Sequence, residues 1–174
     1  MVVHTHEEAT ENPLIVRLER LPLPAALQAL LDSTSSELGY TFFSNLVEHL
    51  SKLLRASCVM VGELLPGRGS LRTLAFCHDG CLQRGIVYPL QGSLDAEVTR
   101  HSLYSCRKGV AERFPGNGLL TRLGAQGYLG IALKDGEGNA LGLLAILHHQ
   151  PLEVEALESS LLGAFAARAG AELE

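Results

Sequence analysis

The sequence has no stretch of apolar residues long enough to cross a lipid bilayer, and it has no cluster of lysine and arginine residues. A membrane-spanning helix needs roughly 18 or more consecutive apolar residues, so we expect no membrane insertion. Acidic residues outnumber basic ones by 19 to 14, and the formal net charge of −5 argues against nucleic acid as a partner. The opening residues, MVVHTHEEATEN, do not resemble a secretory signal, and we therefore expect a cytoplasmic protein.

Cysteine is scarce: the sequence has four, unevenly spaced, at Cys58, Cys77, Cys81 and Cys106. This spacing provides no disulfide framework and no Cys-x-x-Cys pair, so we expect free thiols and no zinc site. The cluster Cys77-His78-Asp79-Gly80-Cys81 is the nearest approach to a metal motif. A two-residue turn at Asp79-Gly80 places the two cysteines on opposite faces of a hairpin, whereas a three-residue loop would bring them to one face.

Two short apolar runs near the C-terminal end organise the chain. Residues 128–133 and 140–147 flank the turn-forming cluster Asp135-Gly136-Glu137-Gly138-Asn139, which predicts a β-hairpin. Neither run alternates cleanly between apolar and polar residues. Both faces of these strands should therefore be covered, which predicts that they form the centre of a sheet.

Upstream of this hairpin, apolar periodicity predicts two helices followed by three strands. Residues 1–20 are polar and mixed, with His4 and His6 close together, and we interpret them as a flexible N-terminal arm. Helices are predicted from residue 23 to about residue 32 and over residues 41–55. Strands are predicted over residues 58–64, 70–77 and 82–90, the last two joined by a type I′ turn at Asp79-Gly80.

The remaining segments predict an insertion and a final helix. Residues 92–101 suggest a short helix, residues 103–106 a short strand, and residues 109–123 an irregular segment with helical turns. A long insertion of this kind within a domain often forms a lid or a pocket wall. The last helix is expected over residues 152–173, with Pro151 at its start. Together the elements predict an α+β fold, an antiparallel sheet with terminal helices on one face and the insertion on the other.

The most specific resemblance lies in the C-terminal hairpin and the insertion before it. The run YLGIAL at 128–133, the turn Asp135-Gly136-Glu137-Gly138 and LGLLAI at 141–146 resemble the closing hairpin of a GAF domain. YSCRKGVAERFP at 104–115 resembles the insertion of GAF domains in bacterial sensor histidine kinases and in diguanylate cyclases or phosphodiesterases. The resemblance covers residues 23–173. It implies a sensory or dimerising domain over residues 21–174, with about six strands and a small-molecule pocket under the insertion.

The chain departs from this subfamily in places that bear on its chemistry. Members often carry Gly-Thr-Pro-Cys after the third strand, whereas this chain has Gly92-Ser93-Leu94-Asp95. The residue set of the cyclic-nucleotide-binding members is not visible. Cys77-His78 lies at a predicted hairpin end, and not in the helix that would attach a bilin. The cofactor, if any, is therefore unknown.

A candidate pocket follows from the alternation of side chains along residues 128–133. Leu129, Ile131 and Leu133 form a large apolar face suited to packing under helices. The opposite face, with Gly130 and Ala132, leaves space beneath the insertion. The alternative is that an aromatic side chain, Phe114 or Tyr104, fills that space. The full set of candidate ligand-binding residues is Tyr88, Tyr104, Phe114, Tyr128, Gly130 and Ala132.

We therefore expect a small-molecule-sensing and dimerising domain of a bacterial signalling protein, with no catalysis of its own. A kinase or a cyclic-dinucleotide output domain is a possible downstream partner. One alternative is a GAF-fold thiol reductase of the free methionine sulfoxide type, with Cys106 as its thiol. Another is a dimerisation scaffold without a ligand.

The expected homodimer forms through the terminal helices. In the last helix, one apolar stripe centred on Leu157, Leu161 and Phe165 is assigned to the sheet. A second stripe would then be free for a partner chain: Leu162, Ala166, Ala169 and Leu173. The alternative is that the first and last helices cover each other within one chain.

Overall fold

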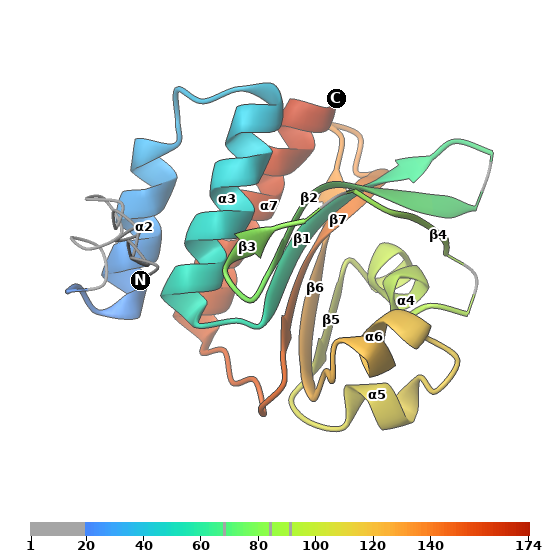
Figure 1. The fold of residues 1–174 in the computed structure, drawn as a ribbon. Helices are drawn as coiled ribbons and strands as arrows, with labels where there is room; N and C mark the ends of the chain where they lie inside the picture. Colours follow the sequence, from blue (N-terminus) through green and yellow to red (C-terminus); the bar gives the residue numbers. More distant parts are fainter. Residues whose placement is uncertain (1–19, 68, 84, 91) are drawn as a thin grey trace, which may run out of the picture.

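A computed structural model describes residues 20–67, 69–83, 85–90 and 92–174. A seven-stranded antiparallel sheet separates two groups of helices (Figure 1). The strand order is β3-β2-β1-β7-β6-β5, and β4 pairs with β2 beside this path. Helices α2, α3 and α7 lie on one face and the shorter helices α4, α5 and α6 on the other (Figure 1). The predicted α+β architecture is confirmed, whereas the predicted N-terminal arm lies outside the described residues except for Arg20.

The hairpin of β6 (Gly127–Lys134) and β7 (Ala140–His148) lies in the interior of the sheet, as predicted. Its loop is held by Asp135, whose Oδ1 atom accepts the backbone N–H groups of Glu137 at 2.9 Å and Asn139 at 2.8 Å. Such a side-chain-to-backbone turn is typical of aspartate at loop positions. β7 also pairs with β1 (Cys58–Leu65), so neither strand of the hairpin is a sheet edge.

The Asp79-Gly80 turn is also confirmed. Both residues have positive φ, 48° and 78°, as a type I′ turn requires. It joins β2 (Ser70–His78) to β3 (Cys81–Leu82) in the two-residue register, with Cys77 opposite Leu82. Cys77 therefore faces the core, while Cys81 is exposed.

The single strand expected over residues 82–90 was wrong, because it is interrupted. Among the described residues, β3 and β4 (Val87–Pro89) are separate strands, and Gln83, Gly85 and Ile86 belong to neither. The hydroxyl of Thr73 accepts the backbone N–H of Ile86 at 2.7 Å, where a regular ladder would use a carbonyl oxygen. The register between β1 and β2 also shifts at Val61/Gly62, opposite this point. A bulge of this kind disrupts regular pairing nearby.

Two helices precede the sheet. α3 (Gly39–Leu54) packs on β1 and β2, and buries an apolar face that includes Phe42, Leu46 and Leu50. α2 (Leu23–Ser33) lies outside α3 and α7 and makes its contacts with these helices (Figure 1). Pro24 occupies the first turn of α2, where the absent N–H has no helical partner to lose.

The last helix, α7 (Ala156–Leu173), starts later than predicted. Residues 151–155 remain extended, because the N–H of Leu152 donates to the carbonyl of Arg107 at 2.9 Å. The start of α7 is a capping box, in which the carboxylates of Glu155 and Glu158 each accept a backbone N–H from the other end of the first turn. The expectation that Pro151 begins the helix was therefore wrong.

The stripe of α7 predicted to be free for a partner chain is mostly buried, together with part of the stripe assigned to the sheet. Phe165 is buried in the core as predicted, Leu162, Ala166 and Ala169 are buried beside it, and Leu157 is 59% exposed. The small stripe faces the sheet because Gly170 allows a close approach, and a Cβ atom there would lie only 2.5 Å from the carbonyl oxygen of Lys134. These residues form no free seam, and α2 and α7 contact each other within one chain, which was the stated alternative. The homodimer itself stays a prediction.

The sheet divides the core in two. Leu129, Ile131 and Leu133 pack with the long helices, and Tyr128 and Ala132 pack on the opposite side, as strand alternation predicts. The insertion adds β5 (Leu103–Cys106) to the sheet beside β6 and covers this second side with α4 (Leu94–His101), α5 (Val110–Arg113) and α6 (Gly118–Arg122). Within the described residues, no helix combines the length and the apolar character needed to span a bilayer.

Candidate functional site

The space expected beside Gly130 is occupied by protein. A Cβ atom at Gly130 would lie 2.6 Å from the hydroxyl oxygen of Tyr128 and closer still to Val98 of α4. The ring of Tyr104 contacts those of Phe114 and Tyr128, at centroid distances of 5.9 and 6.3 Å. Ala132 is buried in the same cluster. The aromatic residues and Val98 thus fill the region under the insertion.

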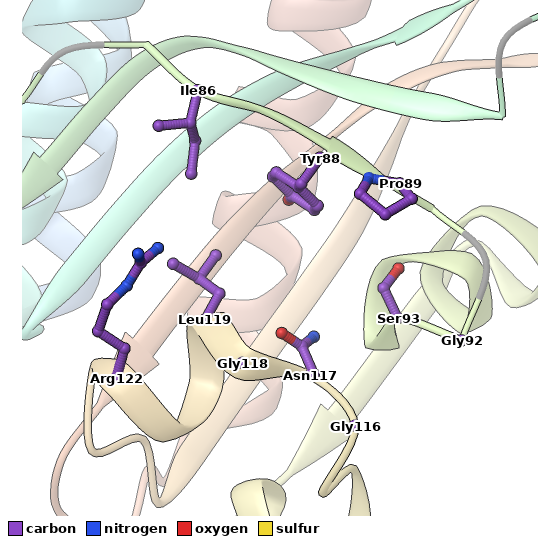
Figure 2. A pocket seen from close by; sticks show the side chains of 10 residues that line it. All are labelled: Ile86, Tyr88, Pro89, Gly92, Ser93, Gly116, Asn117, Gly118, Leu119 and Arg122. Atoms are coloured by element: carbon purple, nitrogen blue, oxygen red, sulfur yellow. The ribbon is translucent and has the colours of Figure 1, made fainter.

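A cleft of about 340 Å³ lies farther out, between β4 and the insertion (Figure 2). Of the six candidate residues, Tyr88 is the one that lines it. Figure 2 shows Tyr88 and Pro89 on the β4 side and Leu119 and Arg122 on the α6 side. The other lining residues are Ile86, Gly92, Ser93, Gly116, Asn117 and Gly118. As a ligand-binding set, the six candidates stay a prediction.

A buried carboxylate lies behind the cleft and joins three elements. Asp95, in the first turn of α4, is 3% exposed. Its Oδ2 atom accepts the hydroxyl of Tyr88 of β4 at 2.7 Å, and its Oδ1 atom accepts the hydroxyl of Tyr128 of β6 at 2.8 Å. We call this arrangement the Tyr88–Asp95–Tyr128 bridge. It connects the cleft wall to the central hairpin.

The bridge changes the protonation chemistry of its members. Burial raises the pKa of Asp95 above its ordinary value, while the two tyrosine hydrogen bonds act in the opposite direction. Burial also raises the pKa of Tyr88 and of Tyr128, and the nearby carboxylate of Asp95 adds to both shifts. The tyrosines therefore stay protonated and act as hydrogen-bond donors to Asp95.

The polar groups at the cleft come from loops and helix ends. The Oδ1 atom of Asn117 caps α6 by accepting the N–H of Leu120 at 3.4 Å. The hydroxyl of Ser93 donates to the carbonyl of Leu90 at 2.5 Å. Arg122 is the charged member of the described lining. Sequence reasoning missed all three because their segments show no periodicity, although Asn117 before Gly118 is a recognisable helix-cap signal.

A family model for the GAF domain matches residues 40–173 of this chain. The chain belongs to the GAF domain family. This confirms the resemblance, and the antiparallel sheet with helices on both faces is the fold that the resemblance implied.

Solved structures with the same fold have different activities. The GAF domain of an Acinetobacter phosphoenolpyruvate-protein phosphotransferase matches with a TM-score of 0.66 and 13% identity, covering 88% of this chain and 94% of that one. The free methionine-R-sulfoxide reductase of Neisseria meningitidis, solved with its substrate, matches with a TM-score of 0.71 and 12% identity, covering 88% and 91%. The chain matches no curated protein in sequence. At these identities the likeness establishes the fold.

The thiols of this GAF domain are separate from the cleft. All four cysteines are free. Burial raises the pKa of Cys58 and of Cys77, which keeps both as thiols. Cys106 is also buried, and its thiol donates to the carbonyl of Lys108 at 3.2 Å. Among the described residues, no group of three or more His, Cys, Asp and Glu side chains could hold a metal ion.

A second hollow, of about 430 Å³, lies on the opposite side of the domain, between α7 and the β6–β7 loop. Its walls are mostly small residues and backbone: Ile131, Ala132, Lys134, Asp135, Gly136, Gly163, Ala166, Ala167, Ala171 and Glu174. Ligand sites usually combine an apolar lining with a few converging polar side chains. The cleft beside Tyr88 fits that description better, and it lies between β4 and the insertion.

Proposed function

We propose that this GAF domain is a small-molecule-sensing regulatory domain of a bacterial, cytoplasmic signal-transduction protein. The proposed ligand site is the cleft between β4 and α6. The observation that carries this proposal is the cleft itself, with its volume of about 340 Å³ and its tyrosine wall. Cavities of roughly 300–1,000 Å³ are typical of small-molecule sites.

The Tyr88–Asp95–Tyr128 bridge supports a sensing role because it provides a route out of the cleft. A ligand that displaced Tyr88 would act on Asp95, and through it on Tyr128 in β6. The residues that alternate with Tyr128 on β6, Leu129 and Ile131, pack in the same core as α7. Occupancy of the cleft would thus bias the position of a terminal helix, which is a suitable output for a regulatory domain.

The ligand site can be tested with two glycines at which an added Cβ atom would meet nothing within 4 Å. Gly118 lines the cleft, and Gly163 lines the second hollow. Native mass spectrometry of freshly purified protein should detect a bound small molecule in the wild type. Gly118→Phe should abolish its binding and Gly163→Phe should retain it. Retention in Gly118→Phe with loss in Gly163→Phe would move the site to the second hollow.

The rival function is reduction of free methionine sulfoxide, favoured by the reductase neighbour and by the free thiols. A catalytic thiol needs access to its substrate and a lowered pKa. Cys106 is 3% exposed and occupied by a backbone carbonyl, and Cys58 and Cys77 have raised pKa values. We therefore propose no catalysis. NADPH-coupled reduction of methionine sulfoxide by the wild type, absent in Cys106→Ser, would establish the enzyme instead.

The partners stay predictions as well. A homodimer through the terminal helices would now need residues other than the buried stripe, such as the exposed Leu157. Sedimentation of the wild type as a monomer at tens of micromolar would rule out that dimer. A kinase or cyclic-dinucleotide output domain would have to be identified from the rest of the protein that carries this domain. A ligand-free scaffold is the outcome if native mass spectrometry and ligand screening both find an empty cleft.

A further inference from the structure

The lining of the cleft has one charge, and it is positive. Of its ten residues, Arg122 is charged, Tyr88, Ser93 and Asn117 are polar, and the remaining ones are apolar residues or glycines. Figure 2 shows the Arg122 side chain extending from α6, beside Leu119, toward Ile86. Among the described residues, no carboxylate belongs to this lining. The local charge is thus opposite in sign to the net charge of the chain, which is −5.

Arg122 also differs from most other arginines of the described residues in having no partner. Arg72, Arg100, Arg107 and Arg168 each form an ion pair with a glutamate. Arg113 instead shares a hydrogen bond with Tyr104. In the part of the chain that the structure describes, no hydrogen bond or ion pair is formed by Arg122. Its five N–H donors are available to a molecule in the cleft.

The buried carboxylate behind the cleft wall, Asp95, already has two hydrogen-bond donors. Both oxygens of Asp95 already accept a tyrosine hydroxyl, one from Tyr88 and one from Tyr128. Asp95 is buried, so the ring of Tyr88 stands between it and the cleft. Burial also raises its pKa, which favours the neutral form. A ligand in the cleft therefore meets Arg122 and the ring of Tyr88, and not the carboxylate.

We infer that the cleft selects a small anionic molecule, and that Arg122 determines this charge preference. The inference rests on the proposed ligand site and names the class of its ligand. The negative group is a carboxylate or a phosphate, because both accept the paired N–H groups of a guanidinium. The side-chain NH₂ group of Asn117, whose oxygen is used to cap α6, provides a second donor in the same lining. Ile86, Pro89 and Leu119 contact the apolar part of the ligand, which has room for about one ring.

The charge preference can be measured with four probes that share one aromatic ring. Phenylacetate and phenyl phosphate carry the two kinds of anion, phenylacetamide is neutral, and phenethylamine is a cation. The cleft itself reports binding, because the backbone N–H groups of Gly92, Gly116 and Gly118 belong to its lining and give separate amide signals in NMR spectra. Gly142, a buried residue of β7 that pairs with Glu63 of β1, serves as the reference signal that should not move.

The wild type should bind at least one of the two anions more tightly than the amide and the amine. Arg122→Gln should weaken anion binding about 5- to 30-fold, as expected for one or two kcal/mol, and leave the amide unchanged. Arg100→Gln removes the same charge from α4 outside the cleft, and it should bind all four probes like the wild type. The difference between phenylacetate and phenyl phosphate then separates a carboxylate site from a phosphate site.

Two results would overturn the inference while leaving the proposed site in place. One is preferential binding of phenethylamine or phenylacetamide at the three cleft glycines. The other is an anion preference that survives Arg122→Gln unchanged. Failure of all four probes to shift these signals at millimolar concentration would also refute an anion-selective cleft. The proposed sensing function would be tested separately, by native mass spectrometry of the wild type and of Gly118→Phe.

Discussion

The Tyr88–Asp95–Tyr128 bridge can be tested by removing a single oxygen atom. Tyr128→Phe keeps the buried ring and deletes the hydroxyl that donates to Asp95 Oδ1 at 2.8 Å. Asp95 retains the hydrogen bond from Tyr88 at 2.7 Å. The Oδ1 atom of Asp95 then has no side-chain donor, and because Asp95 is buried, water does not easily replace the lost hydroxyl.

The size of the effect follows from this burial. Leaving one buried hydrogen-bond acceptor without its donor costs about 1–3 kcal/mol. For a domain of 150–250 residues, each kcal/mol corresponds to about 2–4 °C in melting temperature. Tyr128→Phe should therefore lower the free energy of unfolding by about 1–3 kcal/mol and the melting temperature by about 2–12 °C.

Urea and thermal unfolding followed by circular dichroism measure this difference. Tyr40→Phe is the matched control, because Tyr40 is 69% exposed and its variant should lie within about 0.5 kcal/mol of the wild type. In the background of Asp95→Asn, Tyr128→Phe should cost less, since the two groups interact directly. If Tyr128→Phe were as harmless as Tyr40→Phe, the bridge would contribute nothing to stability and the reasoning above would be refuted.

Two further predictions concern the protonation of Asp95 and the packing of α7. In the folded protein the pKa of Asp95 is raised above its ordinary value of 3.8. The free energy of unfolding of the wild type, relative to Asp95→Asn, should therefore be highest below pH 3.8 and should fall as the pH rises from 3.8 through the raised pKa of the folded state. Parallel urea titrations of both proteins from about pH 4 to pH 8 measure this, and a difference independent of pH would contradict it. Gly163→Ala should stabilise the domain by about 0.5–1 kcal/mol, because a Cβ atom there meets open space within a helix. Gly170→Ala should destabilise the domain by about 1–3 kcal/mol, because its Cβ atom would press on the carbonyl oxygen of Lys134. Equal unfolding midpoints for Gly163→Ala and Gly170→Ala would show that α7 does not pack this closely on β6.

The parts of the fold that the sequence predicted correctly depend on local chemistry. The Asp79-Gly80 turn requires positive φ at both residues, and few dipeptides tolerate that. The two faces of β6 follow from strand alternation alone, so Leu129 and Tyr128 were assigned to the correct sides. These features need no knowledge of distant residues.

The errors arise where a distant residue decides. Residues of both α7 stripes are buried, Phe165 of one and Leu162 of the other, because Gly170 lets the helix approach Lys134 closely. Similarly, the missing side chain of Gly130 predicted empty space on this face of β6, but the side chain of Val98 from α4 fills that space. Tyr88 of the cleft was among the candidate residues, but Arg122 was not, since the fold brings the two together and they share no local pattern.

The weak attachment of β4 has a consequence for amide hydrogen exchange. β4 pairs with β2 over three residues, and two of those residues, Val87 and Pro89, are exposed. Its link to the interior is the hydroxyl of Tyr88. Short, exposed strands open locally at a free energy well below that of global unfolding, whereas β6 and β7 are covered on both faces and exchange only with the whole domain. The wall of the cleft is thus among the least protected parts of the sheet, and a molecule bridging β4 and α6 would slow exchange there first.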